Sequence, residues 1–126
     1  MKIFWISLLI ILIFLSFTVY LNISLEKSSQ EVMNILEEIE KNINQQDWEL
    51  AKNNLDKLIN KWEKMYGPWQ IIMEHQELDN IELSLLKMTE YIKVENQDLA
   101  KAELASLKFL IRHIYTNNVI SIENIF

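Results

Sequence analysis

Few side chains in this 126-residue sequence combine the type and spacing that chemistry requires, and the best group lies in one short segment. His75 is followed there by Glu77, Asp79 and Glu82. In a helix, His75, Asp79 and Glu82 share one face, because positions four and seven residues apart lie on the same side. Such a face is typical of a histidine–carboxylate metal site or an acid–base pair. Zinc takes three or four ligands, however, and the H-E-x-x-H motif is absent because no second histidine follows.

A structural role for His75 is the favoured interpretation. His75 lies between Ile71 and Leu78 on an apolar stripe, so we expect a buried imidazole. A buried imidazole normally has a hydrogen-bonding partner, which Asp79 or Glu77 would supply. We expect no catalytic residue, no metal site and no cofactor, and therefore no enzyme.

Other candidate groups also favour structural roles. His113 follows Arg112 near the expected end of a helix, where positive charge complements the helix dipole. Trp48 and Trp62 fall on an apolar stripe at helical spacing and are interpreted, with Trp69, as packing anchors rather than as ligand platforms.

The composition excludes several classes of function. One glycine, one proline and no cysteine leave no material for a phosphate-binding loop or a G-x-G-x-x-G turn, nor for a disulfide or a zinc–thiolate site. A formal net charge of −6 matches a nucleic acid poorly, so we expect no nucleic-acid partner.

An uncharged run over residues 3–23 predicts a membrane-spanning helix that binds the lipid bilayer. As a helix it is roughly 31 Å long, enough to cross a hydrocarbon core of about 30 Å. A cleaved signal peptide is the alternative, although the exit from the run has no A-x-A-like cleavage site. Because Lys2 is the only flanking positive excess, we expect a single-pass protein of the cell membrane, with a cytoplasmic N-terminus and an extracytoplasmic C-terminal domain. We divide the chain into an anchor, 1–24, and a helical domain with a short tail, 25–126.

Beyond the span, apolar residues recur in alternating steps of three and four, which predicts an all-α chain with about four helices. The first stripe covers residues 25–43 and is expected to continue the span as one helix of about 65 Å. We expect Asn44 or Asp47 to cap the second helix, Gly67-Pro68 to end it, and Asp98 to cap the fourth.

A weak internal repeat indicates how these helices pair. Leu50-Ala51-Lys52 aligns with Leu99-Ala100-Lys101 at an offset of 49 residues. The repeat predicts two helical hairpins, 25–66 and 69–115, in a small antiparallel bundle. The apolar tail, which ends in Ile125 and Phe126, either packs into a groove of the bundle or contacts the membrane.

Several segments together resemble a bacterial protein family catalogued as domain of unknown function 4363. They are Gln46–Ala51, Trp62 with Trp69, His75–Glu82, Leu104–Ile111 and the ending Glu123–Phe126. The resemblance covers the whole chain and implies a small, single-span helical protein of spore-forming Gram-positive bacteria. It carries no established activity. It also implies a multi-pass membrane protein as partner, because members of the family are encoded beside such proteins.

Three functions from different classes follow. The favoured one is a membrane-anchored helical interaction module that binds an integral membrane partner. The second is a structural homo-oligomer, joined through the stripe 25–43 as a parallel coiled coil. The third is a metal-dependent enzyme using His75 with Glu77, Asp79 or Glu82.

Overall fold

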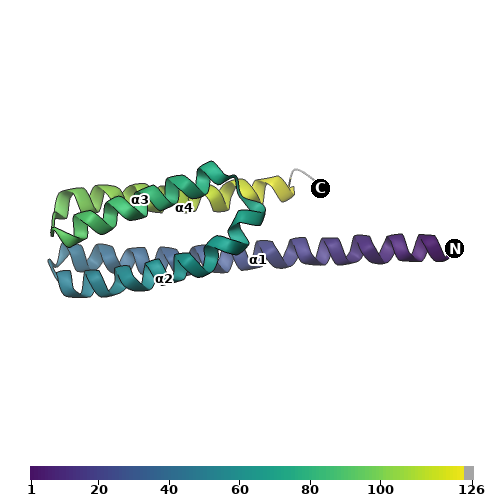
Figure 1. Cartoon of the computed structure of the whole chain (residues 1–126), viewed down its shortest axis with the longest axis horizontal. Helices are drawn as coiled ribbons and strands as arrows, with labels where there is room; N and C mark the ends of the chain where they lie inside the picture. Colours follow the sequence, from purple (N-terminus) through teal and green to yellow (C-terminus); the bar gives the residue numbers. More distant parts are fainter. Residues whose placement is uncertain (124–126) are drawn as a thin grey trace.

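The computed structural model describes the backbone of residues 1–123 and the side chains of residues 1–116. Its elements are α1 (Lys2–Asn44), α2 (Trp48–Ile72), α3 (His75–Lys93) and α4 (Gln97–Glu123). The described part of the chain has no strand, which confirms the all-α prediction. Helices α1 and α2 form one hairpin and α3 and α4 the other, and the two lie side by side (Figure 1). Because α1 also packs on α4 and α2 on α3, the hairpins form an antiparallel four-helix bundle.

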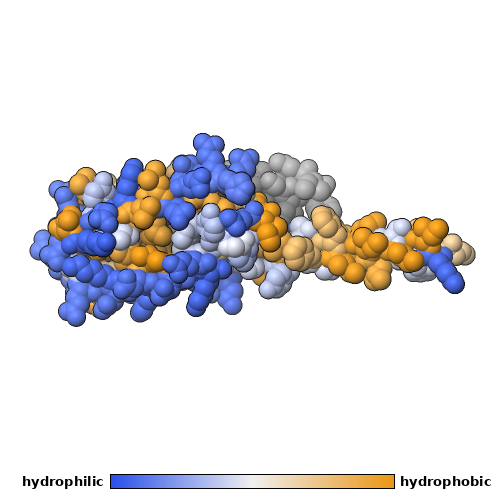
Figure 2. All heavy atoms as spheres, viewed as in Figure 1, coloured by the Kyte–Doolittle hydropathy of each residue, from blue (hydrophilic) through white to orange (hydrophobic). Residues whose placement is uncertain are grey.

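Helix α1 is a single helix of 43 residues, as expected, and only its C-terminal half belongs to the bundle. The N-terminal half extends alone beyond the other helices, and its visible surface is almost entirely apolar (Figures 1 and 2). Among the described residues, α1 is the one helix that is long and apolar enough to cross a membrane. In this apolar half, the hydroxyl groups of Ser7, Ser16 and Thr18 donate hydrogen bonds to carbonyls of the preceding turn, as Thr18 Oγ1 does to Phe14 O at 2.9 Å. These internal bonds reduce the cost of polar groups in a lipid-facing helix.

The bundle core is built from the stripes that the sequence predicts. Each helix contributes apolar side chains at steps of three and four residues, and those at the centre of the bundle are almost fully buried. The most deeply buried are Val32, Leu36, Ile39, Ile43, Leu78, Ile81, Met88, Ile92, Leu104, Leu107, Ile111 and Ile114. Ala51 and Ala100 are also fully buried, where their small side chains allow the helices of each hairpin to approach closely.

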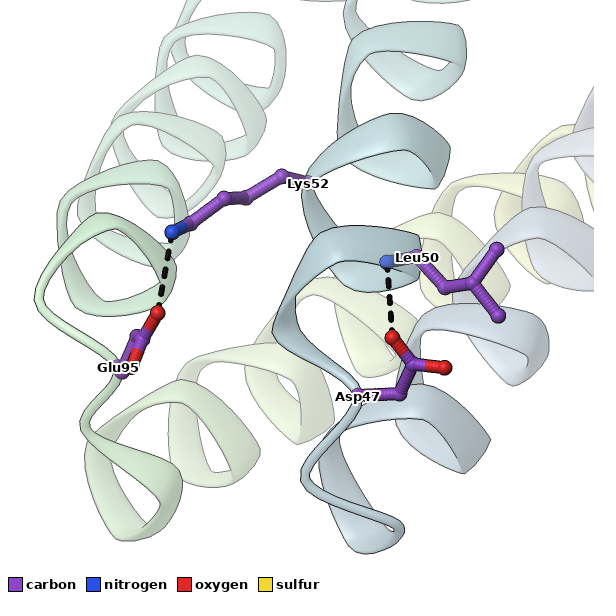
Figure 3. Close-up of polar contacts among 4 residues, drawn as sticks. All are labelled: Asp47, Leu50, Lys52 and Glu95. Atoms are coloured by element: carbon purple, nitrogen blue, oxygen red, sulfur yellow. Dashed lines mark hydrogen bonds and ion pairs between the residues drawn. The ribbon is translucent and has the colours of Figure 1, made fainter.

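The two hairpin turns repeat at the same offset of 49 residues. Gln46 and Glu95 both adopt the left-handed conformation, with φ of 55° and 56°. The next residues, Asp47 and Asn96, each return an N–H bond of 2.9 Å to the preceding helix. Asp47 caps α2 as predicted, since its Oδ1 accepts a bond from Leu50 N–H (Figure 3).

The predicted cap at Asp98 is wrong. Asn96 Oδ1 accepts the bond from Leu99 N–H at 3.1 Å, and Asp98 lies inside the first turn of α4. Asn96 is the residue 49 positions after Asp47, so the cap follows the register of the repeat.

The predicted end of α2 at Gly67-Pro68 is also wrong, because the helix continues to Ile72 with Pro68 inside it. A proline removes one hydrogen bond and bends a helix, and the last turns of α2 do bend across toward α3 (Figure 1). The helix persists because Trp69 and Met73 continue its stripe into the core, at 2 % and 7 % exposure. Ile71 therefore belongs to α2, and it is exposed.

The tail prediction concerns residues that the structure describes only in part. Helix α4 continues to Glu123, and Ile125 and Phe126 lie outside the described residues. Because α4 continues well beyond His113, this histidine is not at a helix end, and the expected dipole role is wrong. The His113 ring stacks instead on Phe109, with ring centroids 5.8 Å apart.

Candidate functional site

The histidine–carboxylate group lies on α3 and is mostly exposed. His75 is the first residue of α3 and is exposed, as are Asp79 and Glu82, while Glu77 is half-buried. The expectation of a buried His75 is wrong because this residue begins its helix at the end of the bundle, where no neighbouring helix covers it. In the part of the chain that the structure describes, no three His, Cys, Asp or Glu side chains lie close enough together to hold a metal ion.

Three tryptophans lie along α2, at its first residue and in its C-terminal half. Trp62 and Trp69 are buried, and their rings meet edge to face with centroids 5.8 Å apart. Tyr66 meets Trp62 at the same centroid distance. Edge-to-face contacts of this kind add to the packing energy of aromatic rings. Trp48, in the first turn of α2, is half-buried against the core.

Polar contacts cross the seam between α1 and α4 at several points along its length. Lys108 forms an ion pair with Glu40, and the Tyr115 hydroxyl donates a hydrogen bond to Glu26 at 3.2 Å. Partial burial, together with the charge of Glu26, raises the pKa of Tyr115 above its usual 10.0. At the far end of this seam, Gln97 donates to the Ile43 carbonyl.

A small recess lies in the α1–α4 seam, with a volume of about 90 Å³. Ser29, at 4 % exposure, is one of its lining residues. The Ser29 hydroxyl has no hydrogen-bond partner among the described residues. A buried hydroxyl without a partner destabilises a fold. The equivalent position in the second hairpin is Leu78, which carries no hydroxyl.

The seam between α2 and α3 holds a larger groove, with a volume of about 240 Å³. Its lining residues are Ile59, Trp62, Glu63, Glu82, Leu85, Leu86 and Thr89. The Lys52–Glu95 ion pair, which joins α2 to the turn between α3 and α4, lies at the hairpin turns rather than along the groove (Figure 3). In Figure 2, which shows the face where α2 and α3 lie in front, apolar atoms are visible between rows of polar ones.

The repeat relates the two seams residue by residue. Lys108 and Glu40, which pair across the α1–α4 seam, correspond to Ile59 and Thr89 across the α2–α3 seam. Leu86 corresponds to Glu37. Equivalent positions thus carry an ion pair in one seam and uncharged residues in the other, where the two helices also pack less extensively.

Sequence reasoning missed this groove, because Leu83 and Leu86 fall off the buried stripe of α3. They are 52 % and 61 % exposed. The signal was present in the repeat: an alignment at the offset of 49 residues places Leu83 opposite Asn34 and Leu86 opposite Glu37. Two leucines thus stand where the first hairpin has polar residues.

Comparison with known proteins identifies one family. Residues 19–125 match the family model described as domain of unknown function (DUF4363). No curated protein and no solved structure matches the chain.

Proposed function

The chain belongs to the domain of unknown function 4363 family, and we propose that it is a membrane-anchored helical module that binds an integral membrane protein and catalyses no reaction. The observation that carries this proposal is the continuity of α1, which passes from an exposed apolar half directly into the bundle core. A helix without a break holds the bundle at a fixed distance from the bilayer. A bundle in that position meets the extracytoplasmic parts of other membrane proteins.

The proposed topology is a retained single span with the N-terminus in the cytoplasm. Lys2 precedes the uncharged run, whereas Glu26 and Lys27 cancel each other after it. The chain has no native cysteine, so a single cysteine at the exposed position Asn53 gives a clean label. A membrane-impermeant maleimide is expected to label this cysteine in intact cells. Labelling only after permeabilisation would reverse the orientation.

The partner is tested by purifying the full-length chain in mild detergent. A co-purifying integral membrane protein at constant stoichiometry is the expected result. A chain that purifies alone from crosslinked and from untreated membranes would overturn the proposal.

The homo-oligomer remains the alternative, but the stripe expected to form its interface is already buried within the single chain. Leu25, Val32 and Leu36 of the stripe 25–43 are at most 3 % exposed within a single chain, as are Ile39 and Ile43. Residues that pack on their own bundle are not free to form the seam of a parallel coiled coil.

A further inference from the structure

We infer that the α2–α3 groove is the docking surface for an amphipathic segment of another protein, one that presents apolar side chains beside a lysine or arginine. This inference rests on the proposed function and specifies which face of the bundle binds and what chemistry the partner brings. It is carried by three observations: an internal contrast between equivalent seams, two exposed leucines, and two unpaired carboxylates.

The two seams differ in how closely their helices pack and in what crosses them. Helices α1 and α4 pack against each other more extensively than α2 and α3 do, and the Lys108–Glu40 ion pair crosses their seam. The equivalent residues of the α2–α3 seam, Ile59 and Thr89, have no charges and cannot form such a pair. Substitution of both members by uncharged residues leaves an apolar floor, with Trp62 at 6 % exposure beneath it.

The exposed leucines define the apolar part of the surface. Leu86 lines the groove and Leu83 lies one turn nearer the start of α3, and more than half of each side chain is exposed. Residues three apart on a helix are neighbours on its surface. Leu83 therefore adds exposed apolar surface next to Leu86, which a partner with apolar side chains would cover.

The carboxylates supply the charge preference. Glu63 of α2 and Glu82 of α3 line the groove from its two walls, at the end nearer the span. Both are exposed, and neither forms an ion pair within the described part of the chain. The groove is apolar along its floor and has two carboxylates at one end. It therefore complements a partner segment in which a basic side chain follows an apolar one.

A second copy of the chain is a poor occupant of the groove, because it would bring further carboxylates rather than a basic side chain. Two anchored chains that use the same face are related by an axis along the membrane normal. Equivalent residues then lie at equal height, so Glu63 and Glu82 of one copy would face the same carboxylates of the other. Like charges at the same height oppose each other, which disfavours this dimer.

Photo-crosslinking of the full-length chain in living cells tests the inference. The probe is p-benzoylphenylalanine at position 86, and the matched control carries it at position 37, the equivalent exposed position on α1. We expect an adduct at position 86 at least tenfold stronger than at position 37. Mass spectrometry of the adduct should place the attachment in a partner segment with a lysine or arginine within one helical turn.

Charge reversal provides the second arm. The variant Glu63→Lys/Glu82→Lys should lower the yield of the adduct and of the co-purified partner at least tenfold. The control Glu37→Lys/Glu38→Lys makes the same change of net charge at exposed positions of α1 and should leave both yields unchanged. All four glutamates are exposed, so their substitution should not disturb the core. Thermal melts that match wild type will show that each variant is folded.

The outcomes separate the two proposals. A partner that co-purifies equally well with wild type and with Glu63→Lys/Glu82→Lys overturns the groove and leaves the proposed function standing. An adduct of twice the chain mass, an adduct to lipid, or equal adducts at positions 86 and 37 also overturn the groove. Wild-type protein that yields neither partner nor adduct overturns both.

Discussion

The two hairpins share a plan and differ in what they show to solvent. Their turns place Gln46 and Glu95 in the same left-handed conformation, and their caps, Asp47 and Asn96, hold equivalent N–H groups. Their surfaces differ at the two seams between the hairpins, because the Lys108–Glu40 ion pair crosses one seam and the other holds the groove lined by Leu86. The features that repeat are those that make a hairpin fold, and the features that differ lie on the surface.

The largest effect should come from the aromatic floor that only the α2–α3 side possesses. Trp62→Ala is expected to lower the free energy of unfolding by about 4 kcal/mol, because it opens a cavity and removes ring contacts with Tyr66 and Trp69. Ile111→Ala, at the equivalent position of the other hairpin, should cost about 3 kcal/mol. Urea denaturation of the full chain in detergent micelles, followed by circular dichroism, measures both. A loss below 1 kcal/mol at Trp62 would show that the floor is not part of the core.

The caps should behave as equals. Asp47→Ala and Asn96→Ala each remove a side-chain acceptor from the first turn of a helix, so each should cost about 1 kcal/mol. Asp98→Ala removes only a favourable interaction with the helix dipole and should cost about 0.5 kcal/mol. The same denaturation experiment ranks the three. If Asp98→Ala exceeds Asn96→Ala, the equivalence of the two turns fails.

Each hairpin contains a buried serine, and removal of the two hydroxyl groups should change the free energy of unfolding in opposite directions. Ser29 and Ser84 are each 4 % exposed, but only Ser84 has a partner, Glu103 Oε1 at 2.8 Å. Ser29→Ala should therefore raise the free energy of unfolding by about 1 kcal/mol, whereas Ser84→Ala should lower it by a similar amount. Differential scanning calorimetry of the two variants beside wild type gives the signs. Two losses of equal size would mean that the Ser29 hydroxyl is satisfied.

The smallest expected effect is a dependence on alkaline pH at the α1–α4 seam. The pKa of Tyr115 is raised in the folded chain, first by partial burial and then by Glu26. A raised pKa stabilises the fold at pH values below the unfolded value near 10, and this stabilisation is lost as the pH rises through the folded pKa. The midpoint of urea denaturation should therefore fall between pH 9 and pH 11 more steeply in wild type than in Tyr115→Phe. Parallel curves for the two proteins would contradict the assignment.

Much of the fold was predictable, because the spacing of apolar residues along the sequence indicates both a helix and the face that it buries. The steps of three and four that contain Leu36 or Leu104 identify both the helices and their buried faces. Helix ends were less predictable, since they depend on contacts that spacing does not contain. Pro68 signals a stop by its own chemistry, yet the burial of Trp69 and Met73 carries α2 past it.

The candidate site was the least predictable part. His75 attracts attention by residue type, but its position at the start of α3 leaves it in solvent. Leu83 and Leu86 attract none, because single exposed leucines are ordinary on protein surfaces. Leu86 gains meaning only beside the groove residues of α2, because a contact between two helices is not contained in the local spacing of either one.

Because α1 is unbroken, it fixes both the rotation of the bundle about the helix axis and the distance of the bundle from the apolar half. Each residue of a helix turns by about 100° and rises by 1.5 Å. One residue inserted after Ile23 would thus rotate the groove by more than a quarter turn about the axis of α1 while moving it only about 1.5 Å along that axis. Seven inserted residues would restore the original direction to within about 20° and move the bundle by about 10 Å. The length of this single helix therefore sets the direction in which the α2–α3 face points relative to the apolar half of α1.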